Sequence, residues 1–212
     1  MDSIQKTGEL MMKIYLIRHG QTDWNLQGRF QGREDIPLNE TGILQAKECA
    51  QALEGESFRA VITSPLSRAK RTAEIIAGHL NIQQIILEEG IIERNFSKVS
   101  GMTYEEREAF YASGEPDDKE PWEQLCNRMM GTLHKYAQQF HQDNIIMISH
   151  GASINSVLSV LSNGATGTGK IILKNTCINI LHYEQGCFRL GDTNLSAAEY
   201  TAMRLERHRN ID

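Results

Sequence analysis

The sequence is poor in the residues that cross-link a chain: it has four cysteines in 212 residues, and no two of them form a C-x-x-C pair. A disulfide framework or a structural zinc site needs cysteines or histidines at short, regular spacings. We therefore expect free thiols, no metal site and a reducing compartment, which predicts a cytoplasmic protein. The cysteines are Cys49, Cys126, Cys177 and Cys187.

An excess of positive charge and a long apolar run are also missing. The formal net charge is −5, so we expect no general attraction to nucleic acid or to an anionic membrane. No stretch approaches the roughly 20 apolar residues that span a bilayer, and residues 1–12 lack the apolar core of a signal peptide. We expect 1–12 to be a disordered or added N-terminal extension, followed by a single domain over 13–212.

Short apolar runs alternate with amphipathic stretches along most of the chain. The runs at 13–17, 58–63, 85–87 and 144–148 are typical of buried parallel strands. Two further runs, at 176–182 and 187–190, flank a Glu-Gln-Gly turn and predict a hairpin. This pattern favours an α/β fold, a three-layer α/β/α sandwich with a mostly parallel central sheet. A segment of different texture over 97–143 predicts a small helical cap.

Two of the predicted strands end in the same way, with a histidine followed by a glycine. The first strand runs into Arg18-His19-Gly20 and the fourth into Ser149-His150-Gly151. The carboxyl ends of parallel strands meet at one edge of a sheet, where open α/β folds bind ligands. Arg68, in the first turn of the helix after the second strand, and Glu93, beyond the third strand, reach the same edge.

These convergent side chains predict a pocket for a phosphate group. Arginine binds phosphate oxygens bidentately, so two arginines and two histidines around one point predict a pocket for a doubly charged, tetrahedral oxyanion. Taken singly, each residue is more often an ordinary surface or core residue. Their convergence at one sheet edge carries the signal.

Five stretches carry the full pattern: Arg18-His19-Gly20-Gln21-Thr22-Asp23-Trp24-Asn25, Gly28-Arg29-Phe30-Gln31-Gly32, Ser64-Pro65-Leu66-Ser67-Arg68-Ala69, Ile92-Glu93-Arg94-Asn95-Phe96 and Ser149-His150-Gly151. Their order and residues resemble the histidine phosphatase superfamily, also called the phosphoglycerate-mutase-like family. The resemblance extends from the first strand to the last core helix.

The resemblance implies that His19 attacks phosphorus and forms a phosphohistidine. It implies that Arg18, Arg68 and His150 hold the transferring phosphoryl group, and that Glu93 protonates the leaving oxygen and then activates water. No cofactor and no metal are expected, since phosphoryl transfer needs mainly positioning and charge stabilisation, which two arginines supply. The remaining residues expected to bind the substrate are Asn25, Gln31, Gly32 and Gly151.

The sequence departs from the family pattern in two places. Many relatives carry Gly-x-x-Glu-Gly after the acidic residue, where this chain has Ser97 and Ser100 in place of the glycine and the glutamate. The aromatic residue usual after Gln-Gly in the early loop is Arg33 here. We expect Arg33 to contact an anionic tail of the substrate.

The family contains phosphatases and mutases. The resemblance implies a longer, basic insertion for a mutase, whereas residues 94–135 hold six Lys or Arg against eight Asp or Glu. We therefore expect a metal-independent phosphomonoesterase that acts on a small phosphorylated metabolite. The alternatives are a cofactor-dependent phosphoglycerate mutase and a non-catalytic phospho-ligand binder. The expected partner is a small-molecule phosphomonoester, and the sequence predicts no oligomeric state.

Overall fold

The computed structural model describes residues 12–209. Most of the predicted N-terminal extension, residues 1–11, therefore lies outside the described part of the chain. Met12, which the sequence analysis assigned to that extension, is the first residue of strand β1 (Met12–Arg18) and is buried. Its side chain packs in the same core cluster as Ile14 and Leu16.

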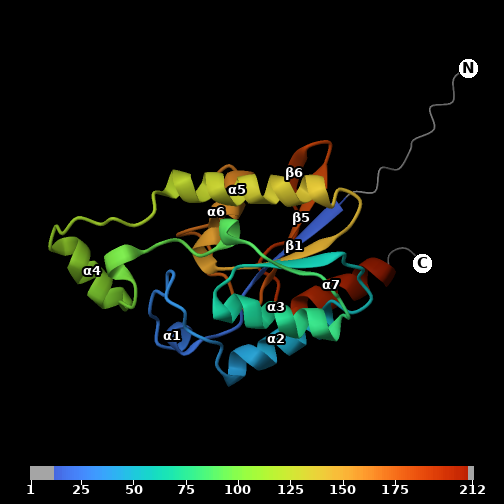
Figure 1. Ribbon diagram of the computed structural model, residues 1–212, viewed down its shortest axis with the longest axis horizontal. Coiled ribbons are helices and arrows are strands. Elements are labelled where there is room, and N and C mark those ends of the chain that lie inside the picture. Colours follow the sequence, from blue (N-terminus) through green and yellow to red (C-terminus); the bar gives the residue numbers. More distant parts are fainter. Residues whose placement is uncertain (1–11, 210–212) are drawn as a thin grey trace, which may run out of the picture.

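A six-stranded sheet forms the centre of the molecule, in the order β3-β2-β4-β1-β5-β6 (Figure 1). The first four strands of this order pair in parallel, and β5 and β6 complete the sheet as an antiparallel hairpin. The mostly parallel sheet and the closing hairpin predicted from the sequence are thus confirmed. The strands after β1 are β2 (Ala60–Thr63), β3 (Ile85–Leu87), β4 (Ile145–Ser149), β5 (Ile178–Glu184) and β6 (Cys187–Leu190).

Helices cover both faces of the sheet. Successive residues of a strand point to opposite faces, and in β1 Ile14 and Leu16 pack with α5 (Trp122–Gln139) and α6 (Gly151–Leu161). The intervening Tyr15 and Ile17 pack with the helices of the other face. This arrangement confirms the three-layer α/β/α sandwich. The helices of the second face are α2 (Glu40–Ala52), α3 (Ser67–His79) and α7 (Ala197–Arg209).

The segment expected to form the cap divides into two parts. Helix α5 packs its apolar stripe, which includes Leu125, Met129 and Leu133, onto the sheet and so belongs to the outer layer of the sandwich. Only the shorter elements before it, with the loop up to residue 121, stand apart, and Figure 1 shows α4 projecting well beyond the sheet. These elements are η2 (Ser97–Val99) and α4 (Tyr104–Ala112).

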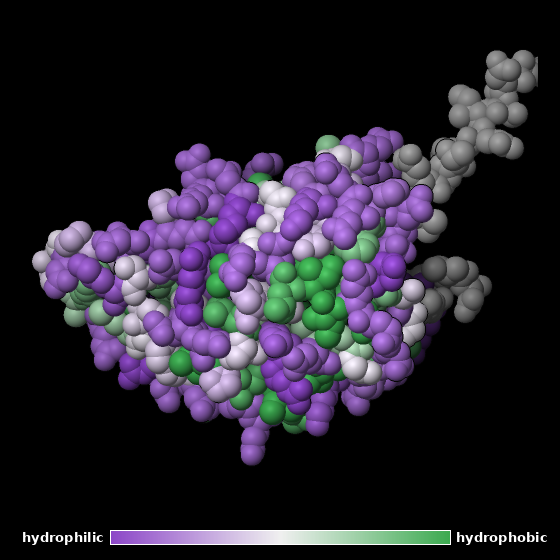
Figure 2. All heavy atoms as spheres, viewed as in Figure 1, coloured by the Kyte–Doolittle hydropathy of each residue, from purple (hydrophilic) through white to green (hydrophobic). Residues whose placement is uncertain are grey.

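The surface seen in Figure 2 is mostly hydrophilic, with a smaller apolar area near its centre. Across residues 12–209, none of the helices combines the length and the apolar character needed to cross a membrane. Of the four cysteines, Cys49, Cys126 and Cys177 are buried free thiols, and Cys187 is an exposed free thiol.

Candidate active site

The ends of β1 and β4 bring the two predicted histidines together. The strands are neighbours in register, with Arg18 opposite Ser149, so the residues that follow them meet at the carboxyl edge of the sheet. The rings of His19 and His150 lie 5.1 Å apart, centroid to centroid. Both side chains are buried, with 2% and 0% of their surface exposed.

One ring nitrogen of His19 forms a hydrogen bond with the backbone. Its Nδ1 lies 2.7 Å from the carbonyl oxygen of Gly20. A carbonyl oxygen only accepts hydrogen bonds, so Nδ1 carries the proton and Nε2 keeps its lone pair. Burial, and then the positive charges of Arg68 and Arg18, hold the pKa of His19 well below its usual range. The imidazole is therefore neutral and nucleophilic at neutral pH.

The two arginines are fixed by backbone carbonyl oxygens. Arg68 is fully buried and donates to the carbonyl oxygens of Glu34 (2.6 Å) and Gly32 (2.8 Å). Arg18 donates to the carbonyl oxygen of Leu173 at 2.6 Å. Burial lowers the pKa of Arg68 to about 10, which leaves it charged at neutral pH. The Nε atom of each guanidinium has no partner among the described residues.

His150 lies deeper than His19. Its Nε2 is 2.7 Å from Oγ of Ser64, and its Nδ1 has no partner within residues 12–209. Burial, followed by the charge of Arg68, holds the pKa of His150 well below its usual range. Two neutral imidazoles thus lie beside two charged guanidinium groups.

The carboxylate of Glu93 is held by the first turn of α6. Its Oε1 accepts hydrogen bonds from the backbone N–H of Ser153 (3.0 Å), the hydroxyl of Ser153 (3.1 Å) and the backbone N–H of Arg94 (2.8 Å). Its Oε2 accepts from the backbone N–H of Ala152 at 3.2 Å. A Cβ built on Gly151 would lie 3.7 Å from Nε of Arg18 and 3.9 Å from Oε2 of Glu93, so these two groups flank the same glycine.

A cavity of about 710 Å³ opens over these side chains. Of the predicted site residues it is lined by Arg18, His19, Asn25, Gln31, Arg68, Glu93 and Gly151, whereas His150 and Gly32 lie behind its wall. The outer wall comes from the early loop, the cap and the loop that follows α6. Its members include Phe30, Phe96, Tyr111, Trp122, Thr168 and Ile172.

Comparison with known proteins assigns this architecture to a family. The sequence model described as Histidine phosphatase superfamily (branch 1) matches residues 14–196. The chain belongs to the histidine phosphatase superfamily.

Individual relatives are similar over most of their length. The uncharacterized phosphatase PhoE of Bacillus subtilis is 36% identical over 88% of this chain and 96% of its own. The probable phosphoglycerate mutase GpmB of Cronobacter sakazakii is 32% identical over 82% of this chain and 86% of its own. A solved mutant of the phosphoserine phosphatase from Entamoeba histolytica, in complex with phosphoserine, has a TM-score of 0.77 and 34% identity, and covers 88% of this chain and 98% of its own. The chain is a phosphatase of the histidine phosphatase type.

The charge of this phosphatase's cavity wall differs from the charge of its cap segment as a whole. Arg94, Arg107 and Lys119 line the cavity, but Glu108 is the only acidic residue between 94 and 135 that does so. The other acidic residues of that segment do not line the cavity. The net charge of residues 94–135, on which the sequence argument against a mutase rested, therefore does not describe the side chains that line the cavity.

Two residues expected to contact the substrate are absent from the cavity wall. Arg33 does not line the cavity, and its Nε donates to the carbonyl oxygen of Glu93 at 3.3 Å; its contact with an anionic tail of the substrate stays a prediction. Gly32 does not line the cavity either. Its carbonyl oxygen fixes Arg68, and a side chain at Gly32 would meet Oγ of Ser100 and the ring of Phe96.

Asn25 and Gln31 are held by Thr22, at the start of the short helix α1 (Asp23–Leu26). Oδ1 of Asn25 accepts from the backbone N–H of Thr22 at 3.2 Å and from Nδ2 of Asn175 at 3.3 Å. Oε1 of Gln31 accepts from the hydroxyl of Thr22 at 2.9 Å. The oxygens of both amides are thus engaged by the protein, which orients the two side chains at the cavity wall.

Several residues that hold the site were missed in the sequence. Ser64 was given no role in the site, yet its Oγ lies 2.7 Å from Nε2 of His150. Its position directly after β2 could have shown that it lies at the active edge. Thr72 accepts a hydrogen bond from the backbone N–H of Gly20, and it and Ser153 reach the site through their phase on α3 and α6. Asn175 lies in the turn before β5. These features gave no comparable local signal.

Proposed function

We propose that this phosphatase hydrolyses a small phosphorylated metabolite through a phosphohistidine on Nε2 of His19. One observation carries the proposal. The hydrogen bond from Nδ1 of His19 to the Gly20 carbonyl oxygen leaves Nε2 as the free nitrogen, on a side chain that lines the cavity. The neighbouring guanidinium groups keep the ring neutral and are placed to receive phosphate oxygens.

In the first step, Nε2 of His19 attacks phosphorus and the bond from phosphorus to the leaving oxygen breaks. Arg18 and Arg68 stabilise the charge on the phosphoryl oxygens, and protonated Glu93 gives its proton to the leaving oxygen. In the second step, Glu93 removes a proton from water, and the water oxygen attacks phosphorus. The phosphorus–nitrogen bond then breaks, which releases phosphate and regenerates neutral His19.

We propose that the reaction is metal-independent. Two guanidinium groups supply the positive charge that a metal ion supplies in other phosphoryl-transfer sites. Within the described residues, no three His, Cys, Asp or Glu side chains come together in a group that could hold a metal ion. We also propose a cytoplasmic location, which the free cysteines support.

Phosphoserine is the first substrate to test. The structural neighbour from Entamoeba histolytica was solved with phosphoserine, and another structure of that enzyme with 3-phosphoglyceric acid. Both ligands carry a carboxylate beside the phosphate. The cationic side chains of Arg94 and Arg107, on the outer wall of the cavity, are suited to such a second anionic group.

The same cationic wall favours a phosphoglycerate mutase as the second candidate, since a mutase must hold two anionic groups at once. The probable mutase of Cronobacter sakazakii belongs to the same set of relatives. The two activities differ in whether water or a second substrate molecule receives the phosphoryl group from His19.

The test is phosphate release from a panel of phosphomonoesters that includes phosphoserine and 3-phosphoglycerate, in the presence of EDTA. We expect turnover by the wild type and a loss of about 10³-fold or more in His19→Ala, because a covalent nucleophile acts as a unit with its partners. His79→Ala is the matched control. His79 lies at the end of α3, pairs with Glu54 and does not line the cavity, so the variant should keep full activity.

Quenched reactions with labelled substrate should give an acid-labile, alkali-stable phosphoenzyme in the wild type only. Interconversion of phosphoglycerate isomers without phosphate release would instead establish the mutase. If the protein binds a phosphorylated ligand tightly but catalyses neither reaction, it is a non-catalytic phospho-ligand binder.

A further inference from the structure

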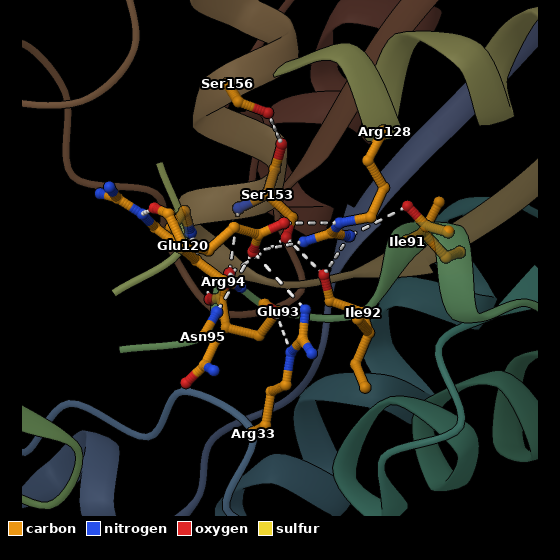
Figure 3. A network of polar contacts seen from close by, with 12 residues as sticks. Arg33, Ile91, Ile92, Glu93, Arg94, Asn95, Glu120, Arg128, Ser153 and Ser156 are labelled. Carbon is orange, nitrogen blue, oxygen red and sulfur yellow. Dashed lines mark hydrogen bonds and ion pairs between the residues drawn. The ribbon is translucent and has the colours of Figure 1, made fainter. Parts of the chain in front are cut away.

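Glu120 is a buried carboxylate at the end of the cap loop, and arginines from two other parts of the chain converge on it (Figure 3). It is 7% exposed. Arg128 of α5 binds it bidentately, with Nε 2.9 Å from Oε1 and Nη2 2.9 Å from Oε2. Arg33 of the early loop forms an ion pair with Oε2 at 3.6 Å. Burial raises the pKa of Glu120, but its hydrogen bonds and the charge of Arg128 outweigh this and hold the pKa below its usual range.

The same two arginines also donate hydrogen bonds to the backbone of the segment that carries Glu93. Nη1 of Arg128 donates to the carbonyl oxygens of Gly90 (3.0 Å) and Ile92 (2.8 Å), just before Glu93. Nε of Arg33 donates to the carbonyl oxygen of Glu93 itself, at 3.3 Å. Figure 3 shows Glu93 enclosed between these contacts.

Glu120 holds the chain on the other side of Glu93. Its Oε2 accepts from the backbone N–H of Asn95 at 3.2 Å, and its own backbone N–H donates to the carbonyl oxygen of Asn95 at 2.9 Å. Nε of Arg94 donates to the carbonyl oxygen of Glu120 at 2.8 Å. The backbone is therefore fixed on both sides of the proposed acid.

Glu93 needs this support because its segment has no regular structure. Residues 92–96 belong to neither a helix nor a strand, so no hydrogen-bond ladder fixes their position. Arg128 and Arg33 both contact the buried carboxylate of Glu120. If Glu120 were replaced by a neutral residue, both guanidinium groups would lose their carboxylate partner. A proton donor must lie within hydrogen-bond reach of the leaving oxygen, and a displacement of about 1 Å can cost about a hundredfold in rate.

We propose that Glu120 is a positioning residue that, through Arg128 and Arg33, sets where Glu93 delivers its proton to the leaving oxygen. This inference rests on the proposed function, in which Glu93 is the general acid. Glu120 does not line the cavity, so it acts on the reaction only through the backbone around Glu93.

The test compares kcat/KM for two substrates that differ in their need for a proton. An alkyl phosphate, phosphoserine, requires protonation of its leaving oxygen, whereas p-nitrophenyl phosphate leaves as a stable phenolate. In Glu120→Gln we expect kcat/KM to fall about tenfold to a hundredfold for phosphoserine and by less than about threefold for p-nitrophenyl phosphate. A general loss of folded enzyme would lower both values equally.

Arg33→Gln provides a second test on a side chain that is 44% exposed and less critical to packing. This variant removes the hydrogen bond to the Glu93 carbonyl oxygen. It should also lower kcat/KM selectively for phosphoserine, but by a smaller factor than Glu120→Gln. Glu56→Gln is the matched control, because Glu56 forms an ion pair with Arg204 and contacts Tyr200 on the far side of the sheet. It should leave the ratio of the two kcat/KM values unchanged.

Two reference variants separate failure of the inference from failure of the proposed function. Turnover that survives in His19→Ala, or an equal loss on both substrates in Glu93→Gln, contradicts the proposed function. If both references behave as proposed, but Glu120→Gln and Arg33→Gln leave the ratio of kcat/KM values as in wild type, the positioning role of Glu120 is wrong and the catalytic assignment stands.

Discussion

Nδ1 of His19 and the carbonyl oxygen of Gly20 are 2.7 Å apart, so the residue that follows the nucleophile sets the nucleophile's tautomer. Gly20 is itself held in place, because its backbone N–H donates to Oγ1 of Thr72 at 3.1 Å. A Cβ on Gly20 would collide with the carbonyl oxygen of Gly42 in the first turn of α2. The glycine after the histidine is thus required by close backbone packing, and that packing aims the reactive nitrogen.

The buried histidines predict that the protein loses stability in mild acid. His19 and His150 have folded-state pKa values well below the usual range, whereas an unfolded histidine titrates near pH 6.5. Below about pH 6.5 the unfolded chain binds more protons than the folded protein, so stability falls as the pH falls. Each such histidine adds about 1.4 kcal/mol per pH unit to the slope.

Urea unfolding between pH 7.5 and 5 measures this slope. His150→Gln should reduce it by the contribution of one histidine, and His79→Gln, on a partly exposed side chain paired with Glu54, is the control. An unchanged slope in His150→Gln would mean that the pKa of His150 is the same in the folded and the unfolded protein.

Arg68→Lys should lower kcat/KM by about a hundredfold, although it keeps the charge. The planar guanidinium donates to two carbonyl oxygens and still has Nε available for phosphate, an arrangement that a lysine ammonium cannot reproduce. Arg71→Lys, one turn along α3 in an exposed pair with Glu74, is the matched control. Equal activity in both variants would show that charge alone is needed at position 68.

Ser97→Gly should raise stability by about 0.5 to 1 kcal/mol. Ser97 has a φ of +48°, in the left-handed region where a Cβ is unfavourable and glycine is not. Ser113→Gly, at a φ of −69°, is the control and should give no gain, and thermal unfolding of the two variants is the measurement. A loss of stability in Ser97→Gly would indicate that the Ser97 side chain contributes more than its backbone strain costs.

The part of the site that depends on strand ends could be predicted from sequence. The runs at 13–17 and 144–148 are almost wholly buried, as continuous apolar runs predict, and they deliver His19 and His150 to neighbouring positions. Arg68 is the second residue of α3, in the first turn as expected. Local pattern suffices here because the ends of parallel strands converge whatever the rest of the chain does.

The features that could not be predicted depend on the direction of individual side chains. An arginine in a polar loop is compatible with a substrate contact or a structural one, and only the folded geometry places Arg33 against Glu93 and Glu120. No element was predicted after residue 190, yet Ala197–Arg209 form α7, in which buried Tyr200 packs against Tyr15 and has its hydroxyl 3.1 Å from Glu56. Helix α5 was grouped with the cap because it lies within the segment of different texture over 97–143, although its apolar stripe packs on the sheet.

The hydrogen bonds that fix the phosphate pocket join residues far apart along the chain. Arg18 and Leu173 are separated by 155 residues, and His150 and Ser64 by 86. Closing such long loops carries an entropic cost, and contacts between distant residues slow folding. The central strand β1 must have both β4 and β5 beside it before the pocket exists, so partly folded chains cannot bind phosphate. We therefore expect newly made protein to gain its activity only when the last strands of the sheet have joined.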